Sequence, residues 1–184
     1  AFFLVAILAL AGLIGIYSWG YHKDQPRLLA SLPCFPLLVA AMVAVVTARD
    51  GFFFLIAWET MSVASFFLVT AEHERREVRH AGWIYLIATH LATAFLLALF
   101  ILLSQRVGSF AFEDFSRLAG IPPNLAGAVF LCAVIGFGTK AGIFPFHVWL
   151  PHAHPAAPCS ISAVMSAVMI KTGIYGILRV LSFL

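Results

Sequence analysis

Charged residues are scarce in this chain: Asp, Glu, Lys and Arg make up 10% of its 184 residues, against 62% hydrophobic residues. A soluble globular domain has about 25% charged residues, so this composition excludes an ordinary soluble protein. The mean hydropathy is +1.01, and the sequence contains several apolar runs of about 20 residues, the length that crosses a bilayer. The short alternating segments of a β-barrel are missing. We therefore expect an all-α integral membrane protein.

Cysteine is also rare, and the three residues Cys34, Cys132 and Cys159 lie far apart in apolar surroundings. Their odd number and wide spacing favour buried free thiols over disulfides or a metal motif. The first apolar run lacks a basic leading region and a small-residue cleavage site, so we do not interpret it as a signal peptide. The net charge of +3 comes from loops, and we expect no nucleic-acid partner.

The apolar runs predict one transmembrane domain, a polytopic helical bundle that covers residues 1–184 with about six membrane segments. These are 1–17, 33–48, 51–70, 81–103, 125–150 (interrupted) and 158–182. Both ends lie inside apolar runs, and we expect the sequence to be a fragment of a longer protein. The charged stretch 71–82 is predicted to be a solvated loop. A short amphipathic surface helix is expected from Phe112, ended by Gly120 and the Pro122-Pro123 pair.

The segment 125–150 carries the stretch "GFGTKAGIFPFHVWLP", which is unusual for a membrane helix. As a straight helix at 1.5 Å per residue it would reach about 39 Å, more than the roughly 30 Å of a hydrocarbon core. Gly136, Gly138 and Gly142 permit close backbone approach, and Pro145 removes a helical hydrogen bond. We predict a broken helix with hydrated backbone groups, as in the discontinuous helices of transporters. A dry packing kink is the alternative.

Three ionisable residues, Glu59, Lys140 and Lys171, fall near the middle of apolar runs. A charge at a helix centre costs roughly 2.5 to 3.5 kcal/mol even on insertion scales, so it should face the bundle, a partner or water. Burial favours the neutral form of an amine and a nearby carboxylate favours the charged form, so a moving carboxylate can switch the protonation of a lysine. Glu59 is the only acid in a predicted span. The alternative is a buried ion pair that only fixes helix packing.

Histidines cluster near the interrupted segment and occur once in the fourth. His90 lies one turn before Thr93, a spacing that suits a proton-relay pair or a core histidine bonded to a hydroxyl. His147, His152 and His154 crowd the stretch "FHVWLPHAHP". Their spacing matches no zinc motif, and interfacial histidines beside an aromatic residue are common, so we expect no metal site.

The stretches "WETMSVASFFLVT", "TKAGIFPFHVWLPHAHPAAP" and "SAVMSAVMIKTGIYGILRV" together resemble the proton-translocating antiporter-like membrane subunit family. That family includes large membrane subunits of respiratory complex I, of membrane-bound hydrogenases such as formate hydrogenlyase, and of multi-subunit sodium/proton antiporters. The resemblance covers nearly the whole chain. It implies about fourteen helices in the full protein, built from two inverted five-helix repeats, with one repeat and the preceding helix in this chain.

The resemblance also assigns individual residues. Glu59 matches the glutamate of a tryptophan-glutamate motif, Lys140 the lysine of the broken helix, and His147 the histidine that follows it. Some members carry a histidine where this chain has Ser166, whereas a lysine at position 171 resembles hydrogenase-type subunits and some complex I subunits. Together with "HPAAP", Lys171 favours the hydrogenase-type branch.

By resemblance, we expect proton translocation by relay through Lys140 and Lys171, gated by Glu59, with His147 in the path. The spacing of His90 and Thr93 makes His90 a further candidate for the relay. The chain would be a non-catalytic, multi-pass subunit of an oxidoreductase complex, of NADH-quinone oxidoreductase or hydrogenase type, in the cell inner (cytoplasmic) membrane. Its expected partners are other membrane and peripheral subunits, the lipid bilayer, and protons or sodium. The chain shows no flavin, iron–sulfur or haem motif, so we expect no cofactor here and redox cofactors in partner subunits.

Three other functions stay open at this point. Sodium/proton antiport would need oxygen ligands such as Glu59, Ser62, Thr89 and Thr93. Membrane electron transfer would use His90 and His147 as axial ligands of a haem. In a passive anchor for a catalytic partner, the buried charges would only specify packing.

Overall fold

The computed structural model describes residues 1–21, 33–117 and 120–184. Within these ranges the elements are, in order, α1 (Phe2–Tyr21), α3 (Cys34–Thr47), α4 (Gly51–Val69), α5 (Arg76–Val107), α6 (Phe112–Ser116), α7 (Pro123–Ala141), α8 (Leu150–Ala156), α9 (Cys159–Val164), the π-helical turn η1 (Met165–Met169) and α10 (Ile170–Leu181). The only β pairing in the described residues is an isolated bridge between Asp50 and Ala111. The predicted all-α class is confirmed.

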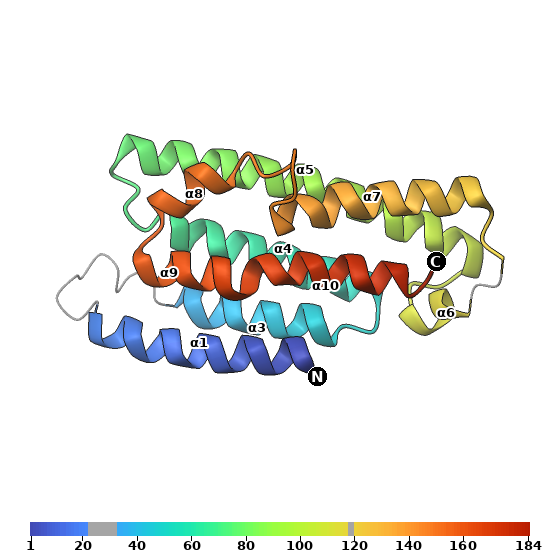
Figure 1. Cartoon of the computed structure of the whole chain (residues 1–184), viewed down its shortest axis with the longest axis horizontal. Coiled ribbons are helices and arrows are strands. Elements are labelled where there is room, and N and C mark those ends of the chain that lie inside the picture. Colours follow the sequence, from blue (N-terminus) through green and yellow to red (C-terminus); the bar gives the residue numbers. More distant parts are fainter. Residues whose placement is uncertain (22–32, 118–119) are drawn as a thin grey trace.

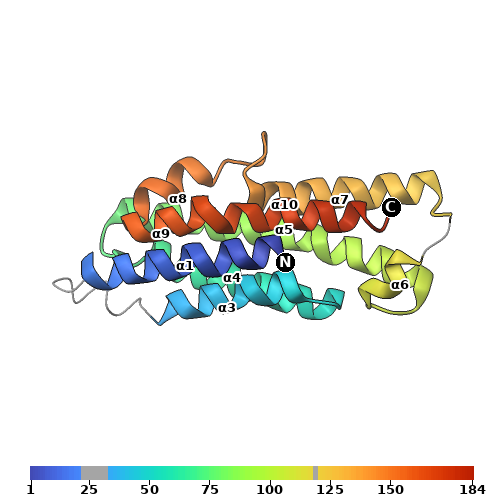
Figure 2. The same ribbon diagram turned by 60° about the horizontal axis from the view of Figure 1, so that its bottom comes forward.

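The long helices run side by side along one axis (Figure 1). Helix α3 packs on α4, α5 packs on both α7 and α8, and α7 also packs on α10. The rotated view in Figure 2 shows the same elongated bundle, with α1 and α3 on one side and α7 and α8 on the other. The centre of the bundle is apolar, and Phe54, Trp58 and Met61 of α4 are at most 1% exposed. Helix α4 therefore forms part of the core.

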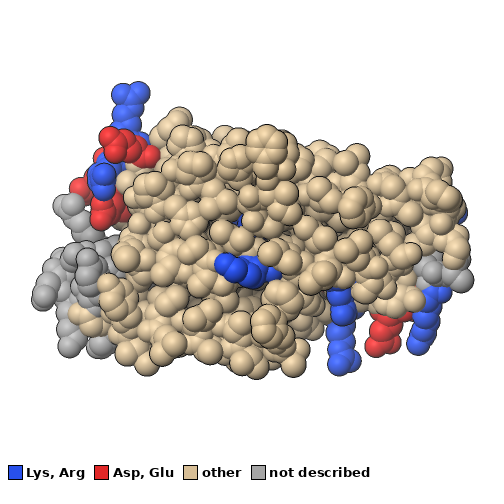
Figure 3. Space-filling model, viewed as in Figure 1, with Lys and Arg blue, Asp and Glu red and all other residues tan. Residues whose placement is uncertain are grey.

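Four helical stretches in the described residues are long and apolar enough to cross a membrane: α4, α5, α7, and the continuous Cys159–Leu181 formed by α9, η1 and α10. Helices α1 and α3 are apolar but have shorter apolar spans. Figure 3 shows most Lys, Arg, Asp and Glu side chains toward the two ends of the molecule, with a largely uncharged surface between them that carries a blue patch near its centre. These features confirm a multi-pass helical membrane protein.

The predicted loop at 71–82 is wrong in its second half, because α5 begins at Arg76. The turn before the helix is closed by the Arg79 side chain, whose Nη1 donates to the carbonyls of His73 and Glu74, each at 2.7 Å. A helix can thus extend through charged residues beyond its apolar span, and hydropathy alone does not predict that extension. The surface helix begins at Phe112 as predicted but ends at Ser116, before residues 118–119, which lie outside the described ranges.

The interrupted segment breaks at Gly142 rather than at Pro145. Helix α7 ends at Ala141, and Gly142 has a left-handed φ of +71°, a conformation that glycine adopts without steric cost. The Ile143 N–H then donates to the Gly138 carbonyl at 2.9 Å, and the Trp149 indole donates to the Thr139 carbonyl at 2.7 Å. Protein groups therefore bond the last-turn carbonyls of Gly138 and Thr139. The predicted hydration of the break stays a prediction.

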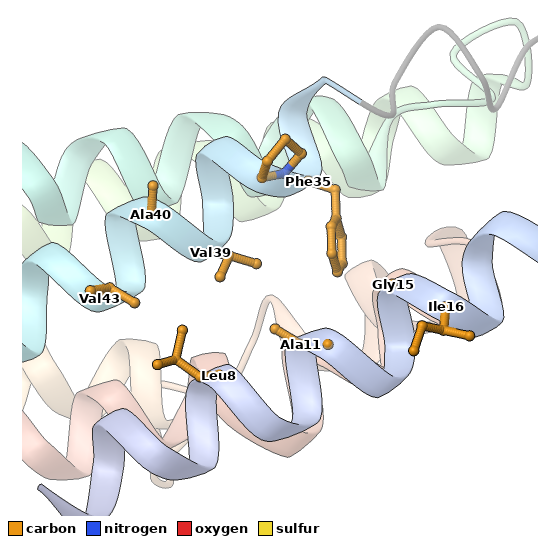
Figure 4. A pocket seen from close by; sticks show the side chains of 10 residues that line it. Leu8, Ala11, Gly15, Ile16, Phe35, Val39, Ala40 and Val43 are labelled. Atoms are coloured by element: carbon orange, nitrogen blue, oxygen red, sulfur yellow. The ribbon is translucent and has the colours of Figure 1, made fainter.

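An apolar pocket of about 800 Å³ lies between α1 and α3. Figure 4 shows Leu8 of α1 and Phe35 and Val39 of α3 pointing into the space between the two helices. None of the lining residues is ionisable. The charged groups of the candidate site therefore lie elsewhere.

Candidate functional site

The candidate site is centred on Lys140, which lies in the last turn of α7. Its side chain is only 1% exposed. Its Nζ donates to the Ser62 hydroxyl of α4 at 3.1 Å and to the Tyr85 hydroxyl of α5 at 2.7 Å. Three helices that are separate in the sequence therefore meet at one amine. Of the three alternatives given for a charge in an apolar run, Lys140 follows the first, since it faces the interior of the bundle.

The hydroxyl partners of Lys140 are themselves bonded. Ser62 donates to the Trp58 carbonyl at 3.1 Å, and Ser65 lies 2.7 Å from the Met61 carbonyl. Ser65 and Tyr85 share a hydrogen bond between their hydroxyls. The three hydroxyls of Ser62, Ser65 and Tyr85 form a connected group next to the lysine, which we call the hydroxyl cluster.

Aromatic rings enclose this site. Trp149 is fully buried and packs edge to face on Tyr85, with ring centroids 5.1 Å apart. Trp58 and Phe137 make a similar contact at 5.2 Å on the preceding turns of α4 and α7. The Lys140 Nζ lies 5.0 Å from the centroid of the Tyr85 ring, within the range of cation–π attraction. The amine is thus held in a low-dielectric environment.

Glu59 lies one turn before Ser62 on α4 and contacts a histidine rather than the lysine. Its Oε2 is 3.4 Å from His90 Nε2, with the two side chains 31% and 51% exposed, respectively. The other oxygen, Oε1, is buried, and no described residue forms a hydrogen bond with it. Among the ion pairs of the described residues, none within 4 Å joins Glu59 to Lys140. The charge of Glu59 can therefore reach Lys140 only across a longer distance, without contact.

Each ring nitrogen of His90 has a polar neighbour. Its Nδ1 lies 3.0 Å from the Leu86 carbonyl of the preceding turn, opposite the nitrogen that faces Glu59. Thr93 donates to the Thr89 carbonyl at 3.0 Å. The contact partner of His90 on a neighbouring helix is therefore Glu59, a pairing that the sequence analysis did not anticipate. A role for His90 in a relay stays a prediction.

Lys171 lies on α10, which crosses the middle of the view in Figure 1, and its side chain is exposed. Its Nζ donates to the Ser166 carbonyl. This carbonyl is in the π-helical turn η1, where the Ile170 N–H bonds to the Met165 carbonyl five residues earlier. Lys171 is therefore anchored to its own helix.

The two lysines lie at a similar level along the long axis of the bundle. A Cβ on Gly173 would stand 2.6 Å from the Phe137 carbonyl oxygen and 2.7 Å from the Ala141 nitrogen, so α10 touches α7 beside Lys140. Lys171 is two residues from Gly173, which is about 3 Å along a helix axis. The structure thus brings both lysines to one level, with Lys140 inside the bundle and Lys171 on its surface.

The histidines after the break are spread out. His147 is half-buried, with its ring 5.7 Å from that of Phe144, and no described residue forms a hydrogen bond with its buried Nδ1. His154 Nδ1 is 2.8 Å from the Ser162 hydroxyl, and His152 packs against His80. None of these contacts involves Lys140. In the described part of the chain, no three His, Cys, Asp or Glu side chains are placed to hold a metal ion.

All three cysteines are free, as predicted, but they are not all buried. Cys34 and Cys132 are half-buried and Cys159 is exposed. Cys159 opens the last span, directly after Pro158, where the helix end leaves the packed core.

The comparison with known proteins agrees with this architecture. Residues 48–184 match the family model described as NADH:quinone oxidoreductase/Mrp antiporter, TM. The chain belongs to this family. The predicted resemblance is confirmed.

Two curated relatives and one solved structure illustrate the family. Hydrogenase-4 component B of Escherichia coli (strain K12) is 40% identical over 182 residues, which are 98% of this chain and 27% of that protein. NAD(P)H-quinone oxidoreductase chain 4 3 of Picosynechococcus sp. is 30% identical over 178 residues, 96% of this chain and 32% of that protein. The structure of the Mrp complex from Dietzia sp. DQ12-45-1b matches with a TM-score of 0.71 and 28% identity, over 80% of this chain and 16% of that chain.

The 40% identity to a hydrogenase component agrees with the hydrogenase-type branch favoured by Lys171 and "HPAAP". The chain spans about a third or less of the length of the curated relatives it matches. The inverted repeat implied by the resemblance stays a prediction.

Lys140 was predictable from the sequence, but most of what surrounds it was not. Ser62 was weighed only as a sodium ligand, and Ser65 and Tyr85 were not singled out. A usable signal was present, because Ser62 and Ser65 follow Glu59 at intervals of three residues and so lie near one face of a helix. Tyr85 gave no such signal, since hydrophobic rings with a polar tip are common in membrane helices.

Proposed function

We propose that this chain is part of an antiporter-like subunit that moves protons across the cell inner membrane, within a redox-driven complex of hydrogenase or complex I type. In this proposal Lys140 takes up and releases the proton, Glu59 modulates it, and Lys171 passes it onward. Other membrane and peripheral subunits would supply the redox cofactors. Support for the setting comes from the family and from relatives named as a hydrogenase component and a quinone oxidoreductase chain.

The observation that carries the proposal is a fully buried lysine with two neutral hydroxyl partners and no ion-pair partner within 4 Å among the described residues. A buried charge that served only to fix packing would be expected to sit in a close ion pair, since an unpaired charge is costly in a low-dielectric interior. Hydroxyl oxygens hold a proton on an amine less tightly than a carboxylate in contact does. This arrangement suits a group that must both gain and lose a proton.

The energies are of the right size for a membrane pump. Moving one charge across a potential of 100 mV requires about 2.3 kcal/mol. A change of two units in the pKa of a carrier group corresponds to about 2.7 kcal/mol. A modest rearrangement of charge near Lys140, such as a movement of Glu59, would therefore be enough to drive a proton on or off.

Membrane vesicles that contain the intact complex provide the test. They would be supplied with an electron donor that the complex accepts, and internal acidification would be recorded with a pH-sensitive dye in the presence and absence of sodium. We expect acidification without sodium, and at least about a tenfold decrease in acidification per electron in Lys140→Met. Leu131→Met, on the exposed face of the same helix, is the matched control and should behave as wild type.

Each rival function has its own signature in this assay. Flux that requires sodium would show antiport in place of proton pumping. If Lys140→Met assembles poorly but acidifies normally per assembled complex, the chain is a passive anchor. An absorption band of haem in the purified chain would indicate electron transfer.

A further inference from the structure

The hydroxyl cluster has a fixed direction of hydrogen bonding. Carbonyl oxygens only accept, so Ser65, with a single proton and the carbonyls of Met61 and Ser62 at 2.7 and 3.0 Å, donates to one of them. The hydrogen bond that Ser65 shares with Tyr85 must then be donated by Tyr85. The Tyr85 oxygen therefore presents a lone pair, and not its proton, to Lys140.

Ser62 is oriented in the same way. Its proton is directed to the Trp58 carbonyl at 3.1 Å, so its oxygen also offers only a lone pair to Lys140 at 3.1 Å. Both partners of the amine are thus acceptors. Lys140 must donate two N–H bonds to satisfy them.

Two donated bonds are available in both protonation states of the amine. A lysine ammonium carries three N–H bonds, and the neutral amine carries two and a lone pair. The contacts to Ser62 and Tyr85 therefore survive the loss of one proton. Only the third position on Nζ changes between N–H bond and lone pair.

We propose that Tyr85, Ser62 and Ser65 are positioning residues that hold Lys140 Nζ in one place in both protonation states, so that the proton it exchanges is always the one at the third position. Ser65 acts through Tyr85 by fixing the direction of its hydroxyl proton. This inference rests on the proposed function of Lys140 and adds a mechanism for aiming the proton. Without these acceptors, the lone pair of the Lys140 amine could point in any direction, and proton exchange would no longer be directed to one position.

Other charged groups around the site must be considered in any pH measurement. The charge of Glu59 on α4 can reach Lys140 only without contact, and His90 on α5 contacts that carboxylate. Lys171 on α10 is exposed and bonded to Ser166, and His147 before α8 has no contact with the amine. Removal of a hydroxyl of the cluster changes none of these charged groups, so the hydroxyl variants report the effect of the hydroxyl cluster alone.

The test is the pH dependence of acidification per electron by the intact complex, measured in Tyr85→Phe. An ammonium gains more from a hydrogen bond than a neutral amine does, so loss of the Tyr85 acceptor disfavours the protonated form. We expect the alkaline limb of the profile to move about one pH unit toward acid. Tyr175→Phe is the matched control. Tyr175 lies on α10, outside the hydroxyl cluster, and its half-buried hydroxyl donates to the Val46 carbonyl at 3.0 Å. This variant should leave the profile unmoved.

A second pair of variants protects the test against a folding defect. Ser62→Ala should move the profile in the same direction as Tyr85→Phe, and Ser62→Thr, which keeps a hydroxyl, should restore it. Profiles of Tyr85→Phe and Ser62→Ala that coincide with that of wild type would overturn the inference. If those two profiles match wild type while Lys140→Met fails to acidify the vesicles, only this inference fails and the proposed function stands. If Lys140→Met acidifies the vesicles normally, the proposed function itself is contradicted.

Discussion

Lys140 and Lys171 lie at a similar level of the same bundle and are held in opposite ways. Lys140 is 1% exposed and donates to hydroxyls on two other helices, whereas Lys171 is exposed and donates to a carbonyl of its own helix. The position of the first amine depends on how α4, α5 and α7 pack. The position of the second depends only on the local π-helical turn. The position of a lysine in an apolar run can therefore be set by helix packing or by its own helix, and burial of the side chain distinguishes the two cases.

The contact between α7 and α10 keeps the two lysines at one level, and Gly173→Ala should break it. The added Cβ would stand 2.6 to 2.9 Å from the backbone and side chain of α7, where neither helix can yield easily. We expect a destabilisation of about 2 kcal/mol, seen as a lower thermal unfolding temperature of the purified complex. Gly127→Ala in α7 is the control, because no atom lies within 4 Å of its added Cβ. Equal unfolding temperatures for the two variants would contradict the close contact.

Glu59→Gln tests whether the charge of Glu59 controls Lys140, because it removes the carboxylate and keeps the shape of the side chain. We expect acidification per electron to fall by roughly tenfold or more, as for other groups that control proton transfer. Glu77→Gln is the control, since Glu77 lies at the exposed start of α5 and its side chain is 89% exposed. If Glu59→Gln pumped as well as Glu77→Gln, the carboxylate would have no part in switching Lys140.

A smaller effect is expected from Asp50→Ala at the start of α4. Asp50 accepts hydrogen bonds from the N–H groups of Phe52 and Phe53 at 2.9 and 3.0 Å, and loss of such a cap costs about 1 kcal/mol. The last span, which carries Lys171, starts without a side-chain cap. Thermal unfolding should show a modest loss for Asp50→Ala and little for Asp50→Ser, which can still cap. A full loss in Asp50→Ser would show that something other than the cap matters there.

Hydropathy and length were enough to predict the helical class and an interruption near Lys140, whereas the count of six membrane segments stays a prediction beside four helical stretches long enough to span among the described residues. The prediction attributed the break to the glycines and Pro145 together, but helix α7 ends at Ala141, before Pro145, where the left-handed Gly142 and two backbone hydrogen bonds close the last turn. Proline and glycine both interrupt helices, and the sequence does not say which one acts first. The π-helical turn before Lys171 gave no signal either, because its residues are ordinary helix formers.

The site was predictable to the extent that it depends on one residue. A charge in an apolar run must be accommodated, so Lys140, Lys171 and Glu59 were found from position alone. The partners were not, because contact between Lys140 and Tyr85 depends on the rotation of α5 against α7. A stretch of sequence fixes which residues share a face of one helix, but not which faces meet. Glu59, the only acid in a predicted span, contacts His90 rather than Lys140 for the same reason.

The most direct test of this account compares the two lysines in one experiment. Lys140→Met and Lys171→Met would be measured in the same vesicles, with acidification per electron normalised to the amount of assembled complex. We predict a decrease of at least about tenfold for Lys140→Met, and a decrease of similar size for Lys171→Met, because the two lysines act in series in the proposed relay. Wild-type acidification per electron in Lys140→Met, whatever the result for Lys171→Met, would contradict the claim that the buried amine is the site of proton exchange.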